Sequence, residues 1–491
     1  MIKKLSSLFL CLALVCAATG ALADDAALRD ALAAGKTLVL TRADLPGNPE
    51  NGMPCSLSPD GRTILWRKGL DFVLTRNGTE IPVHAAPERG SGDPYGQLEE
   101  TLVRLSGNFP GFEGVSWSPD GKFFIFSSAY PILNRVDAAD LILVDTENGE
   151  AFAVQTWDHN WQSDGYGTVI EAHFDASGES IWFLGIIRAL AAKSSLFRYI
   201  LAENRTELIL EDIPILTGTQ TLYQAADGGW LVITGSEQAG SRDARDVFLR
   251  YTPSTGSLSA APGGGTVDRS ERSFPSYLLK AAKGVCSPVT GYGLSLVFML
   301  ETSSTASQMS MEMQMQYIAL NAVYDTRRLN QITPEGIDLN RYWELAGDPA
   351  DPASMHLTET DPALIDLMTR DAAHTPDEGD YDRMLEIGRA LLEDNMPTLS
   401  CLCMSPGGNY AVLTAHTLNR ETMEREPSWW LVDPASMTLY PVEIPDALGP
   451  DYFGTAFGAV YRPAIEWTGD ILLVYNDNGS TVEAYRLEAM E

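Results

Sequence analysis

A short phrase recurs along this chain at a nearly constant interval, and this repeat limits the possible folds more than any other feature. The stretch SLSPDGRTILW at 56–66 returns as SWSPDGKFFIFSS at 116–128. The spacings between successive glycines of the phrase are 60, 57, 50, 63, 117 and 61 residues, a single period of about 58 with the fifth interval doubled. The seven glycines are Gly61, Gly121, Gly178, Gly228, Gly291, Gly408 and Gly469.

Each copy of the phrase predicts a β-hairpin. Proline sets φ at the first turn position, aspartate accepts hydrogen bonds within the turn, and glycine adopts a positive φ. The β-rich run that follows, such as 122–128, is the expected outgoing strand. In the clearest copy two more strands follow at 140–146 and 150–156, joined by a tight turn. One period therefore predicts a four-stranded antiparallel meander.

Seven such meanders predict an all-β fold. A lone meander cannot bury both of its apolar faces, whereas sheets arranged radially pack on their neighbours around a central channel. We therefore predict a seven-bladed β-propeller of four-stranded antiparallel blades. The last period supplies only three strands, so we expect the strand at 36–42 to close the ring by pairing with 480–488 and to remove two sheet edges.

The doubled interval contains a stretch, 334–396, without any copy of the phrase. A Thr-Pro-Asp-Glu capping box at 375–378 begins an apolar pattern of helical spacing that ends at Asn395. Asp361 begins a shorter expected helix through Met368. We therefore predict a helical insertion at 334–396 and not an eighth blade.

The phrase SWSPDGKFFIFSS followed by DLILVDTENG resembles the TolB-like propeller repeat, a relative of the WD-repeat propellers. The segment RRLNQIT at 327–333 resembles the fourth strand of that repeat. The resemblance implies a propeller fold. It implies no particular activity, because this repeat serves binding proteins and peptidase gating domains alike.

The first 23 residues have the pattern of a signal peptide. Two lysines precede an apolar run that is short for a bilayer span, and an A-x-A cleavage site occupies 21–23. We predict cleavage before Asp24, which leaves a propeller at 24–491 in the periplasm or outside the cell. Val15 stands where a lipobox before Cys16 requires a small residue, so we favour release over lipid anchoring.

The charge of the chain limits its partners. The formal net charge is -32, and removal of Lys3 and Lys4 with the signal peptide makes it -34. Such an acidic surface repels phosphate backbones, so we expect no nucleic-acid partner. No later stretch has 18 uninterrupted apolar residues, so we expect no membrane span. The oligomeric state is left open.

The connections between the predicted strands are of unequal length. Turns after the first and third strands are short, whereas second-to-third and interblade connections are long. These two kinds of connection emerge on opposite rims of a meander blade, so we expect the long loops to form a functional face. The long connections are 86–113, 129–139, 235–246, 416–428 and 334–396.

The interblade loop WDHNWQSDGYG at 157–167 is the candidate ligand-binding site on that face. Aromatic rings beside carboxylates suit a sugar or a peptide, because rings bury much area with few rotors to freeze. Alternatively, both tryptophans pack beneath the loop. The spacing of the acidic residues does not match a calcium loop. The candidate residues are Trp157, Asp158, His159, Trp161, Asp164 and Tyr166.

A second unusual stretch, MSMEMQMQY at 309–317, places four methionines at every second position. In a strand these side chains share one face, where thioethers suit a soft metal such as Cu(I). Packing between two blades accounts for the same pattern without a metal, and we favour it. We therefore expect no metal site and no cofactor.

Catalytic motifs are missing from the sequence. No serine has glycine on both sides at the spacing of a nucleophile elbow, and the six histidines form no zinc-protease motif. We therefore predict an exported binding or interaction propeller that recognises a polysaccharide, a peptide or an envelope protein. The alternative is a propeller glycoside hydrolase or polysaccharide lyase with dispersed carboxylates at the channel mouth.

Four cysteines remain after the predicted cleavage, each just before a first-hairpin turn. Export makes disulfides possible. Period-2 alternation places Cys286 on one face of its blade and both Cys401 and Cys403 on the opposite face of the next. Two interpretations follow: a bridge from Cys286 to Cys401 or Cys403, or four thiols, with Cys55 included, that act as small apolar residues.

Overall fold

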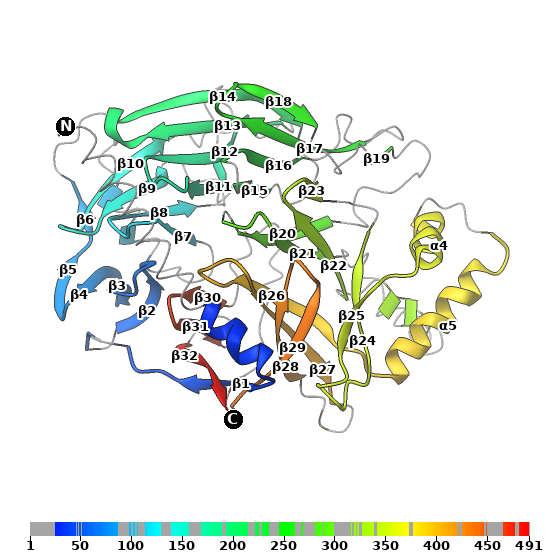
Figure 1. The fold of residues 1–491 in the computed structure, drawn as a ribbon. Helices are drawn as coiled ribbons and strands as arrows, with labels where there is room; N and C mark the ends of the chain where they lie inside the picture. The colour runs from blue at the N-terminus through cyan, green and yellow to red at the C-terminus, as the bar shows by residue number, and fades with distance from the viewer. Residues whose placement is uncertain are drawn as a thin grey trace, which may run out of the picture.

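The computed structural model describes fifteen larger parts of the chain and a few positions between them. The larger parts, single positions excepted, are residues 25–86, 113–128, 139–156, 168–188, 193–214, 221–224, 228–234, 245–260, 280–298, 327–337, 341–372, 377–419, 425–445, 465–476 and 481–490. The described strands form six antiparallel-dominated sheets arranged around a common centre (Figure 1). The prediction of a mostly β protein with propeller-like sheets is confirmed.

Four of the sheets are built around meanders of consecutive strands, which follow from the hairpins that the sequence encodes. The first is β2 (Gly52–Leu57), β3 (Thr63–Lys68), β4 (Asp71–Arg76) and β5 (Thr79–Pro82). The second is β7 (Glu113–Trp117), β8 (Phe123–Ser128), β9 (Ala139–Asp145) and β10 (Glu150–Thr156), with β6 (His84–Ala85) on its outer edge. The third is β11 (Thr168–Phe174), β12 (Ser180–Arg188), β13 (Lys193–Ile200) and β14 (Arg205–Pro214). The fourth is β15 (Thr221–Gln224), β16 (Trp230–Thr234), β17 (Arg245–Thr252) and β18 (Ser257–Ala260), and β19 (Val267–Asp268) also pairs with β17.

The strand near the N-terminus pairs where the sequence predicts. β1 (Thr37–Arg42) lies antiparallel to β32 (Thr481–Met490) along all six of its residues, from Thr37 opposite Met490 to Arg42 opposite Tyr485. On its other side β1 runs parallel to β29 (Thr438–Glu443). The result is one eight-stranded sheet in the order β26, β27, β28, β29, β1, β32, β31, β30. Its other strands are β26 (Thr398–Met404), β27 (Ala411–Leu418), β28 (Arg425–Asp433), β30 (Ile465–Thr468) and β31 (Ile471–Asn476).

The remaining sheet corrects the expectation for 327–333. β22 (Arg328–Thr333) pairs with β21 (Gly293–Phe298), which pairs with β20 (Lys280–Cys286). β22 is therefore the third strand of its unit and not the fourth. Three strands beyond it complete this sheet, β23 (Gly336–Ile337), β24 (Trp343–Ala346) and β25 (His356–Glu359). The first part of the stretch 334–396 thus extends a sheet.

Two helices follow in the same stretch. α4 (Pro362–Ala372) begins after Asp361, whose carboxylate accepts the Ala363 backbone N–H at 2.8 Å, and it continues four residues beyond Met368. α5 (Asp380–Glu393) begins later than the capping box predicts, because Gly379 adopts a positive φ of 91° at its N-cap. The helix pattern ends at Asn395 as predicted, with a φ of 51°.

Three other expectations from the sequence are either outside the described residues or differ from the structure. The methionine stretch lies outside them except for Gln316, which is helical and not in a strand. The connection at 416–428 is much shorter than expected, because β27 and β28 continue to pair as far as Leu418 and Arg425. In the first sheet the second-to-third connection is also a short turn, with Lys68 paired to Asp71.

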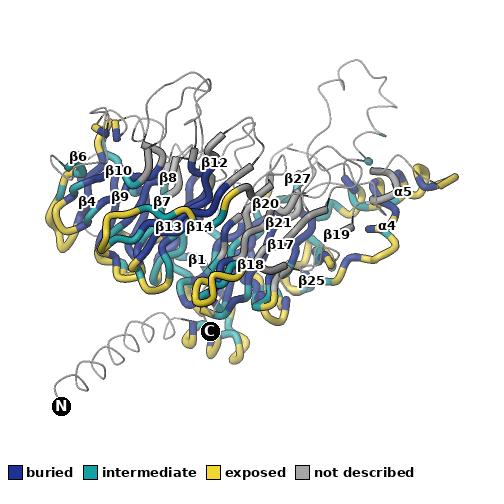
Figure 2. Tube along the Cα trace, turned by 90° about the horizontal axis from the view of Figure 1, so that it is seen from above, coloured by how far each residue is buried: buried dark blue, intermediate teal, exposed yellow. Residues whose placement is uncertain are grey.

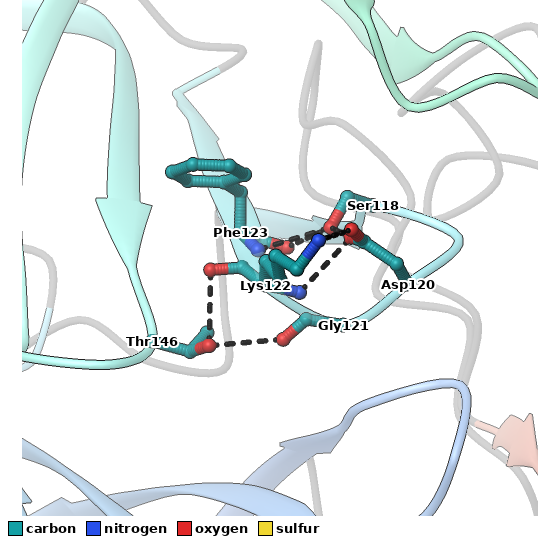
Figure 3. Close-up of polar contacts among 6 residues, drawn as sticks. All are labelled: Ser118, Asp120, Gly121, Lys122, Phe123 and Thr146. Carbon is teal, nitrogen blue, oxygen red and sulfur yellow. Dashed lines mark hydrogen bonds and ion pairs between the residues drawn. The ribbon is translucent and has the colours of Figure 1, made fainter. Parts of the chain in front are cut away.

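The repeated turn is held by its own polar side chains (Figure 3). In the second sheet Ser118 Oγ donates to Asp120 Oδ1 at 2.8 Å, and the Lys122 backbone N–H donates to the same oxygen at 3.1 Å. Thr146 Oγ1, from the end of β9, donates to the carbonyl oxygen of Gly121. Burial alone would raise the pKa of Asp120, but the bonds from Lys122 and Ser118 outweigh it and hold the pKa below its usual value.

The same turns also pack against each other from one sheet to the next. A Cβ atom at Gly121 would lie 3.3 Å from Ser58 Cβ, and one at Gly178 would lie 3.3 Å from Pro119 Cδ. At Gly408 a Cβ would overlap Ser287 Oγ. The turn glycine therefore allows both a positive φ and a close approach between neighbouring sheets. We call the edge that carries these turns the turn rim, and the opposite edge the loop rim.

The core lies between the sheets and not beneath one layer. Buried residues occupy the middle of the strands, whereas exposed residues are concentrated at the hairpin ends (Figure 2). One cluster joins Leu57, Phe126 and Leu473, which come from three different sheets. The first three sheets thus bury both of their faces against neighbours, as the meander argument requires.

Candidate functional site

The predicted ligand-binding loop lies outside the described residues. Trp157, Asp158, His159, Trp161, Asp164 and Tyr166 all belong to the undescribed stretch 157–167. Its two anchors are described: Thr156 ends β10 near the outer edge of the second sheet, and Thr168 begins β11, the first strand of the third. Both anchors are at the loop rim, because β11 ends at the turn 175–178 on the other side. The ligand-binding role of these residues stays a prediction.

Among the described residues, a polar network connects the first strands of three units. Glu466 on β30 accepts hydrogen bonds from Ser56 Oγ and from the Leu57 backbone N–H, the latter at 3.1 Å. Ser56 Oγ in turn accepts the indole N–H of Trp117, on β7, at 2.7 Å. Tyr475 OH donates to the carbonyl oxygen of Cys55 at 2.6 Å. One carboxylate therefore connects the last unit to the first, and its serine partner connects the first to the second.

A second carboxylate makes the same kind of contact elsewhere. Glu171 on β11 is 7% exposed and accepts the backbone N–H of Leu222, on β15 of the next sheet, at 3.0 Å. Its other oxygen lies 2.8 Å from Nε2 of His173, two residues along the same strand. Both glutamates therefore accept hydrogen bonds from a neighbouring sheet, which is a structural role.

One serine–histidine pair also lies among the described residues. Ser400 Oγ is 2.9 Å from Nδ1 of His416, at the point where a bulge interrupts the pairing of β26 with β27. A nucleophilic serine must reach its substrate, but Ser400 is only 3% exposed. The contact gives the buried Ser400 hydroxyl a partner at the bulge and does not form an accessible nucleophile.

The cysteines decide between the two interpretations of the sequence. Cys286 and Cys403 are free thiols, so the proposed bridge from Cys286 is wrong. Cys403 belongs to the cluster that faces the last unit, away from Cys286. Burial raises the pKa of Cys286 to about 12. Burial and the nearby Glu466 raise the pKa of Cys403 to about 12, partly offset by a bond from the Trp467 backbone.

Two features are absent from the described part of the chain. No group of three or more His, Cys, Asp or Glu side chains there could hold a metal ion. Its helices are all too short or too polar to span a membrane.

Sequence reasoning missed these connections for a definite reason. Glu466 and Leu57 are 409 positions apart, and neither belongs to a motif. The available signal was an acidic residue within the first strand of a unit, Glu171 in β11 and Glu466 in β30. Such a residue must find a donor on the neighbouring sheet, because a buried charge is not left unpaired.

Solved structures similar to this chain include propellers of several kinds. An oligogalacturonate lyase from Vibrio parahaemolyticus is 10% identical, with a TM-score of 0.43, over 92% of this chain and 97% of its own. TolB from Acinetobacter baumannii is 11% identical, with a TM-score of 0.32, over 83% of this chain and 67% of its own. The β-propeller domain of the Trilobed protease from Pyrococcus furiosus is 10% identical, with a TM-score of 0.33, over 81% and 96%.

Solved structures similar to this chain thus include TolB and propeller domains, the class of protein that the repeat in the sequence resembles. No family model and no curated protein matches the chain. At such TM-scores the likenesses carry no argument about activity, which must come from the chain's own residues.

Proposed function

We propose that this chain is an exported seven-bladed β-propeller that binds a polysaccharide, a peptide or an envelope protein at its loop rim. In this proposal residues 1–23 are removed as a signal peptide and β1 closes the ring. Six units surround the centre in sequence, and β30, β31 and β32 with β1 form the seventh. The protein acts outside the cytoplasm and recognises its partner without a resident cofactor.

The observation that carries the proposal is the difference between the two rims. At the turn rim neighbouring turns contact each other so closely that Gly408 leaves no space for a Cβ beside Ser287. Long connections join described strands at the opposite rim, as between the end of β10 and the start of β11. Variable binding surface is therefore available at the loop rim and not at the turn rim.

The residues proposed to bind the ligand are those of the loop 157–167. Trp157, Trp161 and Tyr166 would supply flat apolar area, and Asp158, His159 and Asp164 would supply hydrogen bonds to hydroxyl or amide groups. The described carboxylates of the first strands contribute little to such a site, because Glu171 and Glu466 already accept bonds from neighbouring sheets.

A glycan and peptide array probed with the secreted protein tests the proposal. We expect a restricted set of hits, and we expect Trp157→Ala and Trp161→Ala each to weaken binding by about 2 kcal/mol, roughly 30-fold, as for an aromatic hot spot. Val289→Ala is the control, since this apolar side chain is 60% exposed in the turn after β20, at the turn rim and outside the proposed site.

Two outcomes would count against the proposal. Unchanged binding in both tryptophan variants would remove the proposed site, even if the array gave hits. Release of shortened or unsaturated products from an arrayed polysaccharide would show that the protein is a hydrolase or lyase and not a binding protein.

A further inference from the structure

The turn of the sixth unit lacks a residue that the best copies of the repeated turn contain. In the first two units the sequence is Ser-Pro-Asp-Gly, whereas residues 405–408 read Ser-Pro-Gly-Gly. Gly407 therefore stands where Asp60 and Asp120 stand in the other copies. The backbone frame is nevertheless the same, because the Gly408 N–H donates to the carbonyl oxygen of Ser405 at 2.9 Å as the Gly121 N–H does to that of Ser118.

In the turns that contain it, the aspartate makes three contacts. If the serine of Ser-Pro-Asp-Gly is counted as residue one and the residue after the glycine as residue five, the aspartate carboxylate accepts hydrogen bonds from the hydroxyl of residue one and from the backbone N–H of residue five. It also contacts the side chain of residue five. In the first unit these contacts on Asp60 are Ser58 Oγ at 2.6 Å, the Arg62 N–H at 3.1 Å and Arg62 Nε at 3.8 Å. In the second unit, Lys122 Nζ lies 2.8 Å from Asp120 Oδ2.

In the sixth unit a carboxylate from a distant part of the chain makes these three contacts. Asp25 Oδ2 accepts Ser405 Oγ at 3.2 Å, the Asn409 backbone N–H at 3.0 Å and Asn409 Nδ2 at 2.8 Å. These donors are again the hydroxyl of the first turn residue and the backbone and side chain of the fifth. Asp25 is 2% exposed, so it is buried in this arrangement.

Asp25 is the first described residue of a helix at 25–33 that lies against the same unit. Leu28 and Leu32 pack on the cluster that contains Tyr410 and Leu431. A side-chain hydrogen bond from Arg29 reaches Tyr410, where it partly offsets the rise of the tyrosine pKa that burial causes. The helix ends at residue 33, a turn follows in which Gly35 has a φ of 69°, and β1 begins two residues after this glycine.

We infer that Asp25 takes the place of the aspartate that the sixth turn lacks. The turn at 405–409 is thus a carboxylate-binding site, and the helix at 25–33 occupies it in cis. A carboxylate at position 407 would compete for the same donors and would release the helix. Gly407 can accept an aspartate, because a positive φ in this turn is found at Gly408, as at Gly61 and Gly121.

Amide hydrogen exchange of the full secreted chain tests the inference at two places, the amides of 26–33 and the amide of Asn409. In Asp25→Ala we expect both to exchange about tenfold faster or more, since loss of hydrogen bonds to a charged group weakens docking by at least 1.4 kcal/mol. In Asp25→Ala/Gly407→Asp we expect the Asn409 amide to regain its protection while the helix remains labile.

Gly407→Asp alone keeps the N-terminal sequence and its processing unchanged, and so keeps the test informative if Asp25→Ala does not fold. We expect faster exchange at 26–33 with a protected Asn409 amide. Asp30→Ala is the matched control, because Asp30 is an exposed aspartate of the same helix. Wild-type protection of 26–33 in Gly407→Asp, or no recovery at Asn409 in the double variant, would overturn the inference.

Discussion

At the scale of single residues, the turn glycines differ in what surrounds them. Gly61 and Gly408 have nearly the same φ, 66° and 73°. A Cβ on Gly61 would meet nothing within 4 Å, whereas one on Gly408 would overlap Ser287 Oγ. Glycine is therefore required at Gly61 by backbone conformation alone, whereas at Gly408 it is required both by conformation and by the close contact between sheets.

Alanine substitution at these two glycines should therefore give unequal effects. We expect Gly61→Ala to lower the free energy of unfolding by about 1–2 kcal/mol, the cost of a left-handed conformation for an L-residue. Gly408→Ala should lose a further 1–3 kcal/mol or so, because the added methyl overpacks the contact with Ser287. Urea unfolding of both variants measures the difference. Equal losses of unfolding free energy in the two variants would mean that the contact between Gly408 and Ser287 does not limit the size of the residue at position 408.

The free thiols give a second prediction at this scale. The pKa of Cys286 and of Cys403 is raised from 9.0 to about 12 in the folded chain. The protonated thiols thus contribute stability that is complete below pH 9 and is lost as the pH rises from 9 towards about 12. At pH 8.5 we expect little alkylation of either thiol in the native protein and complete alkylation in urea, measured by mass spectrometry. Rapid alkylation of native Cys403 would contradict its burial.

At the scale of elements, the sequence predicts what local chemistry decides. The hairpins around Gly61 and Gly121 follow from turn residues and strand periodicity, and the pairing of β1 follows from a three-stranded last unit. The order of strands around β22 does not follow, because the long stretch 299–327 separates β22 from its neighbour β21. The first residue of α5 is missed as well, since a glycine at position 379 forms its N-cap.

The candidate site is less predictable than the fold. An aromatic loop can be recognised from its composition, but its side-chain placement depends on the surrounding sheets. The contacts of Glu466 with the first unit and of Asp25 with the sixth join residues that no local pattern relates. For the contact of Asp25 there is one local sign in the sequence: the turn at 405–408 has Gly407 where the best copies of the turn have aspartate.

Removal of β1 should damage two units at once. Deletion of residues 24–43 exposes the edges of β29 and β32, to which β1 is hydrogen-bonded. It also removes Leu38 and Leu40, both buried, each contributing about 1.5–3 kcal/mol. We expect a lower melting temperature and aggregation through the unpaired edges, measured by calorimetry and light scattering. A monomeric deletion variant that melts like the full chain would show that β1 is not needed for the fold.

At the scale of the whole molecule, charge opposes compactness. The chain has 66 acidic and 34 basic residues, so repulsion between like charges acts across the folded surface. Salt screens this repulsion, since the Debye length falls from about 30 Å at 0.01 M to about 8 Å at 0.15 M. The described ion pairs at the surface, such as Lys68 with Glu80, lose attraction in the same range, but exposed pairs contribute little.

We therefore expect the melting temperature to rise between 0.01 and 0.15 M sodium chloride, by roughly 1 °C for each kcal/mol of repulsion that is screened. Most of the rise should be complete at 0.15 M, because exposed charges farther apart than the Debye length of about 8 Å are then largely screened. Potassium chloride and sodium chloride should act alike, which separates screening from ion-specific effects on apolar hydration. A melting temperature that falls with salt would show that attractive ion pairs, and not repulsion, dominate the surface electrostatics of this propeller.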